Sequence, residues 1–102
     1  MLKLKPNCEL CDVDLPPNAS NARICTYECT FCSDCVDAVL MNVCPNCGGG
    51  LCERPLRPAN EHREGISLLQ HPASTERVFT SLSRDEIELF SACLGSIAPS
   101  ER

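Results

Sequence analysis

The feature that most constrains this chain is a set of eight cysteines that form four close pairs between Cys8 and Cys47. The spacing is Cys8-x2-Cys11-x13-Cys25-x3-Cys29-x2-Cys32-x2-Cys35-x8-Cys44-x2-Cys47. A short gap lets one tight turn supply two thiolates to a tetrahedral Zn²⁺ ion. Four such pairs predict two Zn²⁺ per chain, each with four sulfur ligands. Such closed sites are structural, because catalytic zinc keeps one position open for water.

The stretch that carries these cysteines has few apolar residues from which to build a core. Tyr27 and Phe31 are the only aromatic residues between positions 1 and 52. A domain of about 50 residues with so thin a core needs disulfides or metal to fold. The N-terminus shows no signal-peptide core, and no segment approaches the roughly 18 apolar residues that span a membrane. We therefore expect a cytoplasmic protein whose paired cysteines bind metal.

Which pairs share a metal ion is a question of topology. Only Thr30 and Phe31 separate the second pair from the third, so consecutive pairing would leave a two-residue junction between independent modules. The short gap before the fourth pair also disfavours a self-contained second module. Alternate pairing, in which the chain weaves through both sites as a cross-brace, is therefore predicted. The first site is assigned to Cys8, Cys11, Cys32 and Cys35, and the second to Cys25, Cys29, Cys44 and Cys47.

Over residues 8–48 the register of the eight ligands resembles that of RING finger domains. The flanks that carry the resemblance are Cys8-Glu-Leu-Cys11, the run Cys29-Thr-Phe-Cys32-Ser-Asp-Cys35-Val36 and the ending Cys44-Pro-Asn-Cys47. The resemblance implies a small zinc-stabilised α+β fold, a RING-like cross-brace. This chain is an all-cysteine version, with Cys29 where RING domains usually place a histidine.

In RING-type ubiquitin ligases, an apolar surface docks the conjugating enzyme. The resemblance places the matching positions at Leu10, Val39 and Pro45, a possible partner surface. The cationic residue that commonly follows the last ligands is replaced by Gly48-Gly-Gly50. From Leu4 to the Arg54-Pro-Leu-Arg-Pro58 run, the chain also resembles a small bacterial family of short, cysteine-rich proteins described only as a domain of unknown function. That resemblance implies a bacterial cytoplasmic protein and no activity.

Several cysteine and histidine assignments stay open. An iron–sulfur protein is a rival, because Cys29-x2-Cys32-x2-Cys35 opens as a ferredoxin run does, although the next gap is eight residues long. Cys52 is a spare thiol or a substitute ligand. Cys93 lies beside a helical apolar stripe and is expected to be a core or interface residue. His62 and His71 lie far from any ligand pair and are expected to face solvent.

The regular elements predicted by local pattern are few. Two short strands or a hairpin are expected at 23–27 and 29–32, and a short helix at 33–41, capped by Ser33, with Val36, Val39 and Leu40 facing inward. Residues 53–80 contain three prolines and no sustained periodicity, which predicts a linker, extended or partly disordered. This divides the chain into a zinc-binding domain (1–52), the linker (53–80) and a C-terminal part (81–102).

The C-terminal part carries the clearest helix signal. Ser83-Arg-Asp-Glu86 is a capping box, and Leu82 and Ile87 are spaced as a hydrophobic staple. Apolar residues at Ile87, Phe90, Leu94 and Ile97 form one stripe, so an amphipathic helix is predicted over about 84–97. That stripe can pack on the zinc-binding core, on a partner or on a second copy as a homodimer.

Charge bears on the class of partner. The formal net charge is −5, and residues 1–52 carry three cations against six carboxylates. A nucleic-acid reader normally shows a basic patch, so a nucleic-acid partner is not expected. With closed metal sites and no catalytic dyad, we expect a non-enzymatic protein-interaction module, with a protein partner whose identity the sequence does not give and no membrane association. The alternative is a RING-type E3-like adaptor in a ubiquitin-like conjugation pathway.

Overall fold

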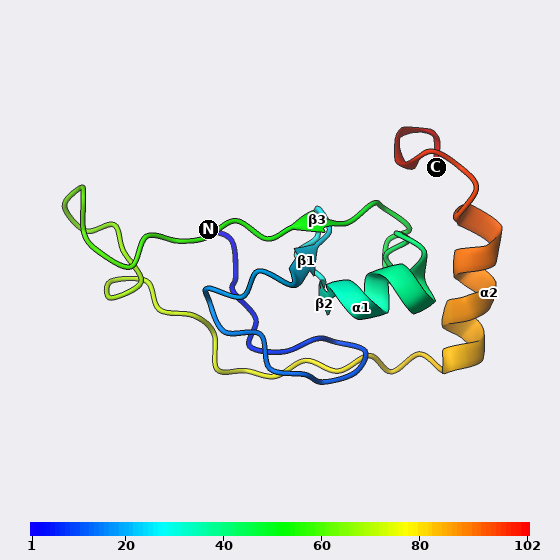
Figure 1. Ribbon diagram of the computed structural model, residues 1–102, viewed down its shortest axis with the longest axis horizontal. Helices are drawn as coiled ribbons and strands as arrows, with labels where there is room; N and C mark the ends of the chain where they lie inside the picture. The colour runs from blue at the N-terminus through cyan, green and yellow to red at the C-terminus, as the bar shows by residue number, and fades with distance from the viewer.

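A three-stranded antiparallel sheet lies at the centre of the computed structural model, which describes residues 1–102 (Figure 1). Its strands are β1 (Ala22–Ile24), β2 (Thr30–Cys32) and β3 (Cys52–Glu53), in the order β2-β1-β3. The predicted hairpin of two short strands is confirmed, but β1 ends before Cys25. The chain leaves the sheet there, because the cysteine-containing turn that follows passes through a left-handed residue, Glu28 (φ 67°). The third strand was not predicted.

The predicted helix at 33–41 is present in an altered form. It consists of one α-helical turn, α1 (Ser33–Cys35), followed by a π-helical turn, η1 (Val36–Leu40). Its N-cap is Cys32 and not Ser33, because the Cys32 sulfur accepts the backbone N–H of Cys35 at 3.5 Å. The wide turn directs both Val36 and Leu40 into the core. It ends at Met41, where the backbone becomes left-handed.

Cysteines make up half of the buried core. Six of the 12 residues in the buried core cluster are cysteines, and the largest apolar members are Phe31, Leu15, Leu40 and Ile87. A core with so little apolar area stabilises a fold only weakly. The cysteine-rich half of this molecule, residues 1–52, therefore needs stabilisation beyond its apolar packing.

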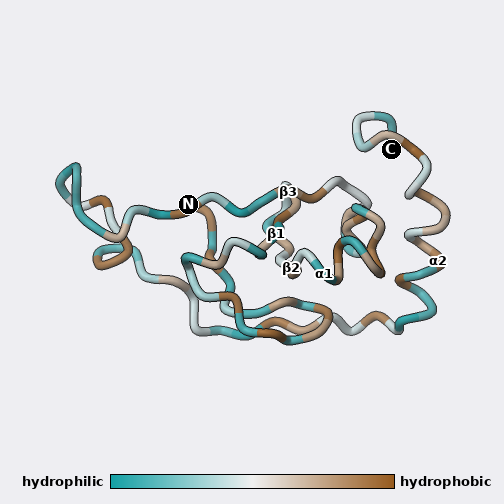
Figure 2. Tube along the Cα trace, viewed as in Figure 1, coloured by the Kyte–Doolittle hydropathy of each residue, from teal (hydrophilic) through white to brown (hydrophobic).

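The C-terminal helix packs on this core. Helix α2 (Arg84–Leu94) begins as predicted, with the Ser83 hydroxyl accepting the N–H of Glu86 at 3.1 Å, and it ends three residues before the predicted position. Ile87 is only 1% exposed and belongs to the core cluster. Figure 2 shows hydrophobic and hydrophilic residues interleaved along α2, as an amphipathic helix requires. The stripe docks on the core through Ile87, while Phe90 and Ile97 stay exposed, and contact with a partner or a second copy stays a prediction.

Between β3 and α2 the chain has no further regular element. It projects from the body as a long loop and then returns beside the N-terminal residues (Figure 1). We call residues 73–82, the returning segment, the strap. Its backbone N–H groups at Ser74 and Thr80 donate to the carbonyls of Leu4 and Glu9, at 2.9 and 2.8 Å. The predicted linker is thus extended and held against the cysteine-rich half, while the three-part domain division remains a prediction.

A buried arginine anchors the start of this segment. The Arg54 side chain is 1% exposed and donates to the carbonyls of Lys5, Leu15 and Pro16. Three segments distant in sequence therefore meet at one guanidinium. Chain termination after residue 52 would remove this contact, so the cysteine-rich half and the segment that follows it are structurally coupled. A short 3-10 turn, η2 (Pro99–Glu101), follows α2.

Candidate metal centres

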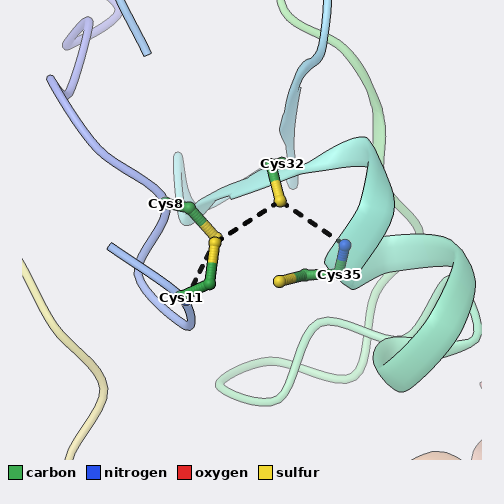
Figure 3. A group of neighbouring side chains, drawn as sticks. All are labelled: Cys8, Cys11, Cys32 and Cys35. Atoms are coloured by element: carbon green, nitrogen blue, oxygen red, sulfur yellow. Dashed lines mark hydrogen bonds between the residues drawn. The ribbon is translucent and has the colours of Figure 1, made fainter. Parts of the chain in front are cut away.

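Four cysteine side chains converge next to the sheet. The Sγ atoms of Cys8, Cys11, Cys32 and Cys35 all lie within 4.8 Å of one another, and Figure 3 shows them drawn from three parts of the chain. The Cys11 and Cys32 sulfurs are 3.7 Å apart. A tetrahedral ion with metal–sulfur bonds of about 2.3 Å holds its sulfurs about 3.8 Å apart. The observed spacing fits such an ion, and we call this group the first centre.

Tight backbone turns position the paired cysteines. In residues 8–12, which we call the first knuckle, the N–H of Asp12 donates to the Cys8 carbonyl at 2.9 Å, and the Cys11 N–H points at the Cys8 sulfur at 3.5 Å. In residues 44–48, the second knuckle, the N–H of Gly48 donates to the Cys44 carbonyl at 2.8 Å. Each turn ends in a left-handed residue, with φ of 66° at Asp12 and 80° at Gly48. The turn across the two-residue gap thus fixes the positions of both sulfurs of a pair.

A second group forms beside η1. The sulfurs of Cys25, Cys44 and Cys47 lie within 4.8 Å of one another, and we call them the second centre. The predicted fourth member, Cys29, is outside this tight group but borders it, because its thiol interacts with Cys25 and Cys44. The Asn46 amide also donates to the Cys29 sulfur at 3.4 Å. The three-residue gap between Cys25 and Cys29 forms a wider turn than the two-residue gaps, which accounts for the displacement.

Four of the paired cysteines resist ionisation on their own. Burial raises the pKa of Cys29, Cys32, Cys35 and Cys44, and the charge of a neighbouring thiolate raises the pKa of Cys35 and Cys44 further. Cys8 is the exception: burial opposes its ionisation, but backbone N–H groups, the Cys11 N–H foremost, bring its pKa below the ordinary value. A cation among the sulfurs removes both obstacles, since metal ligation deprotonates a thiol outright. Both groups therefore have the donor set of a metal site.

The remaining cysteines and the histidines lie elsewhere. Cys52 is exposed on β3 and Cys93 is exposed on α2, and neither belongs to a cysteine group. Cys93 is therefore not a core residue, because its position on α2 faces away from the core, whereas the alternative expectation of an interface residue stays a prediction. His62 is exposed and His71 is partly buried, and neither lies in a group that can hold a metal ion.

The predicted partner surface is smaller than expected. Leu10 and Val39 are half-buried and packed against the core cluster, whereas Pro45 is buried and presents no apolar face. Pro45 lies inside the second knuckle, on the segment against which α2 packs at Gly48. A groove of about 390 Å³ remains beside the first centre, and its lining includes Val13, Ala38 and Val39.

One residue that supports the first centre was missed by sequence reasoning. Glu9 is 3% exposed, and its carboxylate accepts the Thr30 N–H at 2.6 Å and the Lys5 ammonium at 3.0 Å. It therefore joins the first knuckle to β2, which carries Cys32. The sequence offered only a weak signal for this role. Glu9 lies between the two cysteines of a pair, where a carboxylate is ordinarily expected to face solvent.

Comparison with known proteins relates this sequence to a family. A family model described as a protein of unknown function, DUF1272, matches residues 1–57, which include all four cysteine pairs. An uncharacterised protein of Rhizobium meliloti (strain 1021) is 55% identical over 78 residues, covering 76% of this chain and 86% of that protein. No solved structure matches the chain. None of its helices is long and apolar enough to cross a membrane.

Proposed function

The chain belongs to the DUF1272 family of proteins of unknown function, and from that premise we propose that it is a structural zinc protein that serves as a protein-interaction module. The observation that carries the proposal is the first centre, where four sulfurs lie within 4.8 Å of one another. This is the donor set and spacing of a closed tetrahedral zinc site. Such a site contributes to folding and leaves no position for substrate.

In this proposal each centre holds one Zn²⁺ through four thiolates. Cys8, Cys11, Cys32 and Cys35 bind the first ion, and Cys25, Cys29, Cys44 and Cys47 bind the second. Cys29 supplies the last ligand, since it already contacts Cys25 and Cys44. The chain then weaves through both sites as a RING-like cross-brace. A reducing compartment such as the cytoplasm keeps these thiols available for metal.

The partner in this proposal is a protein that contacts the groove beside the first centre. Half-buried Val39 and exposed Val13 line that groove. Acidic side chains and a formal charge of −5 favour a protein partner over a nucleic acid. The burial of Pro45 favours a plain interaction module over a RING-type adaptor of ubiquitin-like conjugation.

The proposal is tested first by metal analysis of the purified chain. We expect two zinc ions per chain, no iron and no visible absorbance. A brown protein that contains iron would support the ferredoxin alternative, and a folded chain without metal would contradict the proposal altogether.

The interaction role needs a separate test. A partner captured from a lysate of the source bacterium should be lost with Val39→Asp and retained with Leu69→Asp, because Leu69 is 84% exposed on the projecting loop, far along the chain from the groove. Equal retention by both variants would place the contact elsewhere. A chemical activity that copurifies with the wild-type chain and is lost with either centre would contradict the non-catalytic role.

A further inference from the structure

The two knuckles share a contact that sulfur ligation does not require. In each, the left-handed residue directly after the second cysteine turns its carbonyl outward to an arginine of the C-terminal half. The Arg77 Nη2 donates to the Asp12 carbonyl at 2.7 Å, and the Arg102 Nη1 donates to the Gly48 carbonyl at 3.1 Å. These arginines are separated from their acceptors by 65 and 54 residues. At both centres, the carbonyl of the residue directly after the second cysteine thus accepts a hydrogen bond from a distant arginine.

The grip on the first knuckle has several bonds. Arg77 also donates to the Asp12 carboxylate at 2.9 and 3.2 Å and to the Asp14 carboxylate at 2.7 Å. The Asp12 carboxylate accepts a further bond, at 2.9 Å, from the amide of Asn7, which is completely buried. The same Asn7 is bonded to Val78, the neighbour of Arg77 on the strap, through both its amide nitrogen and its oxygen. Asp12 is therefore held from two sides.

At the second knuckle, Arg102 bonds to residues on both sides of the cysteine pair. The Nη1 atom of Arg102 donates to the Asn42 carbonyl at 2.9 Å as well as to the Gly48 carbonyl. Asn42 precedes Cys44, and Gly48 follows Cys47. One guanidinium nitrogen therefore ties together the two ends of the segment that carries both cysteines. The Arg102 Nε atom in turn donates to the Ile97 carbonyl at 3.0 Å, which fixes the side chain against the segment after α2.

Metal loss requires thiolates to leave the ion, and opening of a knuckle would free both sulfurs of one pair. A guanidinium holds a planar, preorganised set of donors that a lysine cannot reproduce, and its charge is favourable beside an anionic thiolate centre. We propose that Arg77 and Arg102 act as an arginine clamp, in which each arginine keeps one knuckle closed and slows loss of metal from that centre alone. This inference rests on the proposed function, since it needs metal in both centres.

The test resolves the two centres in the full chain. The protein is loaded with ¹¹³Cd²⁺, which gives one resonance for each centre, and the decay of each resonance is followed after addition of a chelator. Arg77→Ala should accelerate loss from the first centre by about three- to ten-fold, and Arg102→Ala should accelerate loss from the second by about two- to five-fold, as expected for exposed charged hydrogen bonds. Each variant should leave the other centre within two-fold of the wild-type rate, and only the affected resonance should shift.

Two further variants complete the design. Arg84→Ala removes an exposed arginine from the first turn of α2 that bonds to neither knuckle, so both rates should stay unchanged. Arg77→Lys keeps the charge but loses the planar set of N–H donors. Metal loss from the first centre should therefore be accelerated nearly as much as in Arg77→Ala. Full rescue by lysine would show that charge alone acts and would overturn the hydrogen-bonded clamp.

The remaining outcomes separate the clamp from the proposed function. Equal acceleration at both centres by either alanine variant indicates a general loss of stability and overturns the clamp. Release rates of Arg77→Ala and Arg102→Ala that match those of Arg84→Ala also overturn the clamp. A chain that binds no metal overturns the proposed function and the clamp together, whereas a chain that holds two ions and releases them at unchanged rates overturns the clamp alone.

Discussion

The two metal centres are built from the same turn but completed differently. In the first centre, two pairs with two-residue gaps bring all four sulfurs together, with Glu9 holding the knuckle to β2. In the second, one pair has a three-residue gap, and Cys29 remains at the border of the group. A two-residue gap makes a turn that presents both sulfurs before any ion arrives. The three-residue gap leaves one sulfur of the second pair outside the tight group.

The two centres also differ in what covers them. The strap runs along the first knuckle, through the bonds of Thr80 to Glu9 and of Arg77 to Asp12. Helix α2 lies against the second knuckle, where Leu94 and Phe90 approach Gly48. Hydrogen bonds thus support both centres, through the strap at the first and through Arg102 at the second, but only the second knuckle also has the apolar packing of α2 against it. This contrast predicts that apolar substitutions on the face of α2 that contacts Gly48 act on the second centre and not on the first.

The largest effect expected is that of metal removal, which acts on both centres. Stripping zinc with a strong chelator should unfold residues 1–52, because structural zinc is worth on the order of 10 kcal/mol and the sulfur-rich core cannot replace it. Helix α2 should lose its tertiary contacts at the same time, since Ile87 packs into that core. Amide dispersion in NMR spectra, recorded with and without chelator, measures both events. Native-like dispersion without metal would show that packing alone maintains the fold.

Single ligand substitutions should separate the two centres. Cys32→Ser removes a member of the tight first group and should cost about 4 kcal/mol or more, together with one zinc ion. Cys29→Ser removes the bordering thiol and should cost less, about 1–3 kcal/mol, because water can take its place on the ion. Denaturant unfolding with metal analysis gives both numbers, and Cys52→Ser, at an exposed thiol outside both groups, is the control. Equal losses would mean that Cys29 contributes as much to the second centre as Cys32 does to the first, which would contradict the difference between the centres.

A substitution in α2 should weaken the apolar support. Ile87→Ala should lower the free energy of unfolding by about 2–4 kcal/mol, because it leaves a cavity at a side chain that is 1% exposed. Leu89→Ala, at a position on the same helix that is 69% exposed, should change it by less than about 0.5 kcal/mol. Thermal or urea unfolding of the zinc-loaded protein checks both values. Similar effects of the two variants would mean that α2 does not dock through Ile87.

The smallest effect expected compares two glycines with nearly the same backbone conformation. Gly48 and Gly65 have φ of 80° and 79°, but a Cβ at Gly48 would lie 3.1 Å from the Leu94 Cδ1, whereas nothing lies within 4 Å at Gly65. Gly65→Ala should cost about 1 kcal/mol or less from backbone strain alone. Gly48→Ala should add about 1 kcal/mol more, because α2 must shift. If the two substitutions cost the same, the contact between α2 and the second knuckle contributes nothing to stability.

Local pattern predicted the elements more reliably than their contacts. The hairpin, the helical turn after Cys32 and the Ser83 cap of α2 all follow from residues that are neighbours in sequence. The cap at 33–35 was assigned to the wrong residue, because a cysteine sulfur, not the Ser33 hydroxyl, accepts the N–H bond. β3 was missed, since its two residues, Cys52 and Glu53, carry no strand signal of their own and pair only because β1 offers a free edge.

The cysteine spacing by itself predicted two groups of paired cysteines, because a turn of two residues is a local structure, and the structure brings four sulfurs together in the first group and three in the second. Only the tertiary structure decided that Cys29 stands at the border of its group and that Pro45 is buried. It also decided that α2 docks on the core and that Arg54, Arg77 and Arg102 reach across the chain to backbone carbonyls. Those contacts join residues dozens of positions apart, and no spacing rule encodes them. They follow from how the strap and α2 pack to cover a core too small to close over its own sulfurs.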